Sequence, residues 1–105
     1  MESTQTESTA KAMARHAAQA EALLKALANA QRLKVLCHLT QGEESVGELT
    51  DKLGLSQSAL SQHLARMKAA GLLASRKSGK QVYYRIASME AQAVLTTLYL
   101  IYCHK

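Results

Sequence analysis

The most reactive side chains in this sequence of 105 residues are its two cysteines, Cys37 and Cys103. Free thiols either fill space as small buried hydrophobes or undergo redox chemistry. Cys37 shares the apolar face of its segment with Leu33 and Leu36, which fits the first role. Cys103 lies roughly opposite the apolar stripe of the last segment, which favours the second. Two thiols that can meet in a cytosolic protein indicate redox chemistry rather than a static disulfide.

A second group of side chains, over residues 57–70, has the pattern of a surface that binds DNA. At about 100° per residue, a helix places Leu60, Leu64 and Met67 on one side. The opposite side is slim and carries hydroxyl and amide groups, which suits close approach to base edges and phosphates in the major groove. The candidates for these contacts are Gln57, Ser58, Ser61 and Gln62, with Arg66 at the flank.

A basic hairpin is predicted directly after this helix. Residues 72–76 and 81–86 have strand patterns, and residues 77–80 form the turn between them. Alternation along the second strand places Tyr83 and Tyr84 on opposite faces. The wing residues expected to contact the minor groove or its phosphates are Lys77, Lys80, Gln81 and Arg85. An ordinary solvated hairpin is the alternative.

The positive charge is concentrated in this part of the chain. The formal net charge is +5, and residues 52–85 carry seven lysines and arginines with no aspartate or glutamate. Such a stretch favours a polyanionic partner such as nucleic acid. A solvated basic surface is the alternative if charge is considered alone.

Five helices and the hairpin are expected to position these groups, in a mainly α fold with a small β wing. The predicted helices cover residues 8–28, 30–40, 46–53, 57–70 and 89–104. Asn29 is the only capping candidate between the first two, so one long helix is the alternative there. Ser45 and Glu48 have capping-box spacing before the third helix. The apolar stripe of the last helix is formed by Val94, Leu98, Ile101 and Tyr102.

Three motifs of the central region carry a family resemblance. They are Ser45-Val46-Gly47-Glu48-Leu49, the run Leu-Ser-Gln-Ser-Ala-Leu-Ser-Gln-His-Leu over residues 55–64, and Gly71-Leu72-Leu73. Together they resemble the ArsR family of bacterial winged helix-turn-helix repressors, over about residues 20–103. The resemblance implies a homodimer through the first and last helices and an effector that weakens binding to operator DNA. It also implies that Gln57, Ser58, Ser61 and Gln62 contact bases and phosphates.

The positions of Cys37 and Cys103 resemble those of the BigR/SqrR/YgaV-like subgroup of this family. That resemblance implies a repressor that senses organic or inorganic persulfides or polysulfides. Oxidised sulfur would link the two cysteines as a disulfide or polysulfide, and the protein would release DNA. Each inserted sulfur extends the reach of the bridge by about 2 Å. Thiols slightly too far apart for a disulfide would therefore prefer a persulfide-derived bridge.

Other functions were weighed against this one. Zinc-type sites need three or four close ligands. The helix at 46–53 has neither Cys nor His, and Glu90 and His104 are fourteen residues apart. We therefore expect no metal and no other cofactor, although a metal or haem sensor with ligands from two subunits is an alternative. No cationic, Gly-rich loop surrounds either cysteine, so a thiol enzyme is not expected.

The chain is expected to form one domain over residues 9–105, after a flexible tail at residues 1–8. The start is polar, rich in Ser, Thr, Glu and Gln, and lacks the basic and apolar segments of a secretory signal. No apolar run approaches the length of a membrane span. A cytoplasmic protein without a membrane partner is the prediction.

Overall fold

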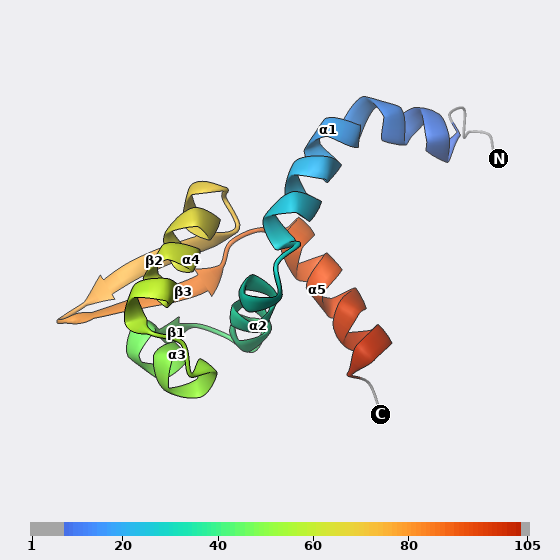
Figure 1. The fold of residues 1–105 in the computed structure, drawn as a ribbon. Coiled ribbons are helices and arrows are strands. Elements are labelled where there is room, and N and C mark those ends of the chain that lie inside the picture. Colours follow the sequence, from blue (N-terminus) through green and yellow to red (C-terminus); the bar gives the residue numbers. More distant parts are fainter. Residues whose placement is uncertain (1–7, 104–105) are drawn as a thin grey trace.

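Five helices and a projecting hairpin make up the fold, in a computed structural model that describes residues 8–103 (Figure 1). The helices are α1 (Thr9–Leu27), α2 (Ala30–Leu39), α3 (Val46–Leu53), α4 (Gln57–Ala69) and α5 (Met89–Tyr102). The strands are β1 (Glu44–Ser45), β2 (Leu73–Ser78) and β3 (Gln81–Ile86). The mainly α fold class with a β wing is confirmed. Apart from Ser8, the predicted tail lies outside the described residues, as does His104.

Local capping explains where the helices begin and end. The Asn29 side chain accepts hydrogen bonds from the backbone N–H groups of Gln31 and Arg32, so α1 and α2 are separate helices and the single long helix is wrong. Ser45 and Glu48 form the predicted capping box, with bonds of 2.8 and 3.1 Å. Gly54 ends α3 in the left-handed conformation at φ 68°, which glycine adopts without steric cost.

The sheet has three strands rather than the predicted two. Its order is β1-β3-β2, and all neighbours are antiparallel. In β1, Glu44 pairs with Tyr84, and Ser45 pairs with Tyr83. A strand of two residues has no alternation to detect, so sequence patterns did not predict it. It lies between α2 and α3 in the chain and pairs with β3 of the wing.

The core lies where α2, α3, α4 and the base of the sheet meet. It consists of Leu27, Val35, Leu36, Leu39, Leu49, Leu60, Leu64, Met67, Leu72, Leu73, Ala91 and Leu95. In the single chain only the N-terminal half of α5 packs against the core. Ala91 and Leu95 face the core, Val94 and Leu98 are half-buried, and Ile101 and Tyr102 are exposed.

Helices α1 and α5 leave a large apolar surface uncovered. The exposed side chains, each between 52% and 78% accessible, are Met13, Leu24, Tyr99, Leu100, Ile101 and Tyr102. Figure 1 shows both helices at the end of the molecule opposite the hairpin tip. An apolar surface of this kind marks an interaction site in a chain of this size. Within residues 8–103, no helix combines the length and the hydropathy needed to cross a membrane.

Candidate functional site

The second helix of the helix-turn-helix unit, α4, has a buried side and a polar side. Leu60, Leu64 and Met67 are buried, as their spacing predicted. Ser56 caps the helix by accepting a hydrogen bond from the backbone N–H of Ala59. All five side chains predicted to contact DNA from this helix are exposed: Gln57, Ser58, Ser61, Gln62 and Arg66. The geometry leaves this polar side available to a duplex.

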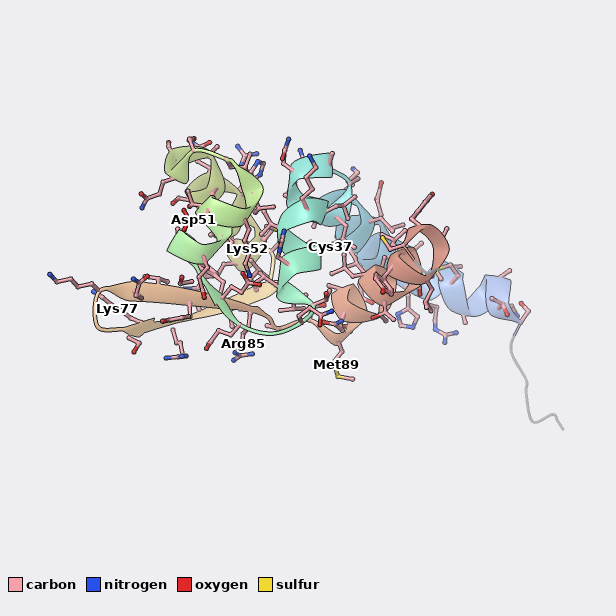
Figure 2. All side chains as sticks on the ribbon, turned by 90° about the horizontal axis from the view of Figure 1, so that it is seen from below. Cys37, Asp51, Lys52, Lys77, Arg85 and Met89 are labelled. Atoms are coloured by element: carbon pink, nitrogen blue, oxygen red, sulfur yellow. The ribbon has the colours of Figure 1, made fainter. Side chains whose placement is uncertain are left out.

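The wing carries the other candidate contacts. Lys77, Lys80, Gln81 and Arg85 are all exposed. Figure 2 shows Lys77 at the far tip of the hairpin and Arg85 on the side of the sheet away from the helices. Tyr84 packs against the core, whereas Tyr83 faces the other way, as alternation predicted. The cationic groups therefore occupy both the tip and the outer face.

A polar cleft of about 480 Å³ separates the helix-turn-helix unit from the wing. Gln57 and Ser61 of α4 line it, and so do Lys80 and Gln81 at the hairpin tip. The α3 side consists of Val46, Gly47, Thr50 and Asp51, and Val82 and Tyr84 complete the lining. No sequence pattern pointed to the α3 residues, because the approach of the wing to α3 is a tertiary contact.

Two acidic residues neutralise part of the basic stretch. Glu43 accepts two hydrogen bonds of 2.8 Å from the Arg76 guanidinium, which also lies over the Tyr83 ring at 4.7 Å. Glu44 pairs with Lys52 at 2.9 Å. Both acids precede residue 52, so the charge count along the sequence overstated the cations free to meet a polyanion.

The Glu43–Arg76 pair makes a pH-dependent contribution to stability. The hydrogen bonds from Arg76 lower the pKa of the Glu43 carboxyl below its ordinary value. A lowered folded-state pKa means that the pair stabilises fully above the ordinary carboxyl range, near pH 4, and loses its effect as the pH falls below it. Glu43→Gln is therefore expected to lower stability at pH 7, and this loss should disappear as the pH falls through the lowered folded-state pKa, as measured by urea unfolding at a series of pH values. In an Arg76→Gln background the substitution should have no effect at any of these pH values; a persistent effect would contradict this assignment.

The two thiols come from different ends of the fold. Cys37 lies on α2 and Cys103 caps the C-terminus of α5; both are free and exposed. The view of Cys37 as a buried space-filler is wrong, because Val35, Leu36 and Leu39 form the core side of α2. Although Cys37 is exposed, desolvation raises the pKa of its thiol, and the negative charge of a Cys103 thiolate raises it further. The two thiols are thus close enough for the charge of one to affect the other.

Metal ligands do not gather around either thiol. In the part of the chain from Ser8 to Cys103, no three His, Cys, Asp or Glu side chains are close enough to hold a metal ion. Glu90 lies in the first turn of α5, whereas His104 is outside the described residues. A metal site built from the described residues alone would need ligands from a second subunit.

Comparisons with known proteins identify the family. Residues 29–75 match the family described as bacterial regulatory protein, arsR family. The chain is 48% identical over 91 residues to the transcriptional activator HlyU of Vibrio cholerae, covering 87% of this chain and 84% of that protein. The structure of reduced HlyU from Vibrio cholerae superimposes with a TM-score of 0.83, over 88% of this chain and 97% of the other.

Two further structures extend the similarity. The transcriptional repressor BigR of Xylella fastidiosa is 36% identical, with a TM-score of 0.87 over 93% of this chain and 100% of that one. A homodimeric winged helix-turn-helix DNA-binding domain of Mycobacterium bovis, a possible ArsR-family regulator, is 31% identical, with a TM-score of 0.72 over 92% and 88%. The resemblance drawn from the three motifs is confirmed. This chain belongs to the ArsR family and is a transcriptional regulator with a winged helix-turn-helix fold.

Proposed function

We propose that this regulator is a cytoplasmic, homodimeric repressor that releases its operator when reactive sulfur links Cys37 to Cys103. The observation that carries this proposal is the thiol pair: two exposed, free cysteines from α2 and α5 whose charges interact. The similarity to BigR, a transcriptional repressor, supports the direction of regulation. The single-domain organisation over residues 9–105 belongs to the same proposal.

The uncovered surface of α1 and α5 supports the homodimer. Leu24 and Ile101 are more than half exposed in the single chain, and burying such side chains against a second copy is favourable. The related Mycobacterium bovis domain is homodimeric. A dimer through α1 and α5 leaves the α4 face and the wing of each subunit free for one half of a symmetric operator.

The bridging chemistry needs a persulfide as oxidant. One cysteine thiolate attacks the outer sulfur of an organic persulfide, a new S–S bond forms, and the organic thiolate leaves. The second cysteine thiolate then attacks the cysteine sulfur of the new protein persulfide, and hydrosulfide leaves. One persulfide thus yields a disulfide, one thiol and one hydrogen sulfide, and the two electrons lost by the cysteines reduce the persulfide. Each additional bridging sulfur consumes one more persulfide and releases one more thiol.

The raised pKa of Cys37 bears on selectivity. The thiolate is the nucleophile, so a raised pKa leaves less of the reactive form at neutral pH. Cys37 should therefore react slowly with ordinary oxidants. Bridging should become faster as the pH rises, because more of Cys37 is then thiolate. If Cys103 held the persulfide, the sulfur to be attacked would lie beside Cys37. This proximity would compensate for the small fraction of Cys37 that is thiolate.

Bridging would act on DNA binding through α2. This helix contacts both α3 and β3, and the strand that follows it, β1, pairs with β3 of the wing. A covalent link would tie it to the C-terminal end of α5, whose apolar side chains form the proposed dimer surface. The two DNA-binding faces of the dimer would then change their relative position, which is the two-state coupling that allostery requires.

Titration of operator DNA with and without an organic persulfide tests the proposal. The reduced protein should bind, and the persulfide-treated protein should lose about 5- to 150-fold in affinity, the usual range of allosteric coupling. Mass spectrometry should show the loss of two hydrogens and the gain of any additional sulfur, and should locate both changes in a bridge between Cys37 and Cys103. Release by zinc, cadmium or arsenite at stoichiometric concentration would instead favour a metal sensor with ligands from two subunits.

Gln62 on the exposed side of α4 is expected to contact a base edge. Gln62→Ala should cost about 1–3 kcal/mol on the operator and little on unrelated DNA, so the specificity ratio falls. Fluorescence anisotropy with both duplexes measures this ratio. Gln41→Ala removes the same amide from an exposed position after α2 and serves as the control. Equal losses on both duplexes would assign Gln62 to the DNA backbone rather than to a base.

A further inference from the structure

The segment between α2 and α3 carries two neighbouring acids that tie it to different parts of the fold. Glu44 pairs with Lys52 of α3 at 2.9 Å. Glu43 instead accepts two hydrogen bonds of 2.8 Å from Arg76 of β2. Because the strand order is β1-β3-β2, the Glu43–Arg76 pair spans β3. It therefore joins the connection after α2 directly to the far strand of the wing.

The geometry of the Glu43–Arg76 pair is suited to transmitting movement. Two N–H···O bonds from one guanidinium fix the orientation of both side chains, whereas a single contact would leave them free to turn. The guanidinium also lies 4.7 Å from the centroid of the Tyr83 ring, which is within cation–π distance. Exposed ion pairs usually have little effect, and bidentate pairs with a defined geometry are the exception. The pair can therefore hold the wing in one orientation relative to the end of α2.

A short hydrogen-bonded connection leads from Cys37 to Glu43. The Thr40 hydroxyl donates to the Cys37 carbonyl at 2.7 Å. The backbone N–H of Gly42 donates to the Leu39 carbonyl at 3.2 Å, so the turn that follows α2 is fastened to its last residues. A displacement of the C-terminal end of α2 would carry Glu43 with it.

We infer that the Glu43–Arg76 pair passes the state of the Cys37–Cys103 link from α2 to the wing, so that bridging withdraws the wing from the DNA. The inference rests on the proposed thiol switch and makes Glu43 and Arg76 positioning residues. The wing is then the element with two positions that coupling between distant sites requires. Neither residue lines the cleft between α4 and the wing, which separates this role from the proposed DNA contacts.

Glu43→Gln tests the inference, because it breaks the pair and leaves every cation of the wing in place. The reduced variant should bind the operator within about threefold of the wild type, since only an exposed ion pair is lost. Mass spectrometry should still find the bridge between Cys37 and Cys103 after treatment with an organic persulfide. Bridging should nevertheless lower operator affinity less than about twofold, against about 5- to 150-fold for the wild type. The added net charge acts on both forms alike, so the ratio of their affinities isolates the coupling.

Glu44→Gln is the matched control, because it makes the same change of charge one residue further on and breaks the pair with Lys52 of α3 instead. Its response to persulfide should equal that of the wild type. In an Arg76→Gln background, Glu43→Gln should change the affinity ratio no further. A wild-type ratio in Glu43→Gln, failure of its bridge to form, or an equal loss of response in Glu44→Gln would overturn the inference alone. A wild type that stays on its operator after persulfide would overturn the proposed function as well.

Discussion

Cys37→Ser and Cys103→Ser are each expected to bind the operator like the wild type and to ignore persulfide. Both residues are exposed, so exchanging sulfur for oxygen disturbs no packed core. A bridge requires both sulfurs, and a persulfide on one cysteine cannot join α2 to α5. On treatment with persulfide, the wild type should lose about 5- to 150-fold in operator affinity, whereas each variant should lose none. Operator titrations before and after treatment with an organic persulfide measure it.

Met89→Leu is a suitable control for this experiment. Met89 is an exposed sulfur-containing residue of α5, 84% accessible, and Figure 2 shows it pointing away from the helices. It cannot form a bridge, so its replacement should leave release by persulfide unchanged. Release of DNA by either single-cysteine variant would exclude the bridge, and modification of the remaining cysteine would then have to explain the switch.

Strong salt dependence is the second large effect expected. If each subunit neutralises three to four phosphates, log affinity should fall against log salt with a slope near −6. Raising the salt from about 50 to 200 mM would then weaken binding about 10³- to 10⁴-fold. Replacing both Lys77 and Lys80 by alanine should reduce the slope to about −2.5 and weaken operator and unrelated DNA alike. Anisotropy titrations at several salt concentrations give the slopes.

Lys52→Gln is the matched control for the wing lysines. Lys52 belongs to the same basic stretch, but its ammonium is already paired with Glu44 at 2.9 Å. Its removal should therefore leave the slope unchanged. A wild-type slope shallower than about −2 would exclude the wing as a phosphate-binding element. A clearly shallower slope of log affinity against log salt in Lys52→Gln would show that the ion pair between Lys52 and Glu44 breaks when the protein binds DNA.

Most secondary structure could be predicted because its signals are local. Asn29, Ser45 and Ser56 cap the helices that follow them, and each cap involves residues within three positions. The periodicity of Leu60, Leu64 and Met67 predicted the buried side of α4. The side chains opposite that core face were predicted to contact DNA, and their exposure is consistent with this.

Contacts between distant segments could not be predicted in the same way. Glu43 and Arg76 are 33 positions apart, and no local sequence pattern predicts that their side chains form an ion pair. A count of charges along the sequence therefore treated Arg76 and Lys52 as cations available to bind DNA. The cleft likewise brings together residues of α3, α4 and the hairpin that are far apart in the sequence.

Local motifs and periodicity were sufficient to predict the family resemblance, the order of helices and wing, and the candidate DNA contacts. Tertiary structure decided which apolar faces are buried: α5 turns Ala91 and Leu95 inward and leaves Ile101 and Tyr102 exposed. It also decided the environment of Cys37, because desolvation, and after it the charge of Cys103 on α5, raise the pKa of this thiol. The physical reason is that periodicity identifies a face, whereas burial and electrostatic coupling depend on which element packs against it.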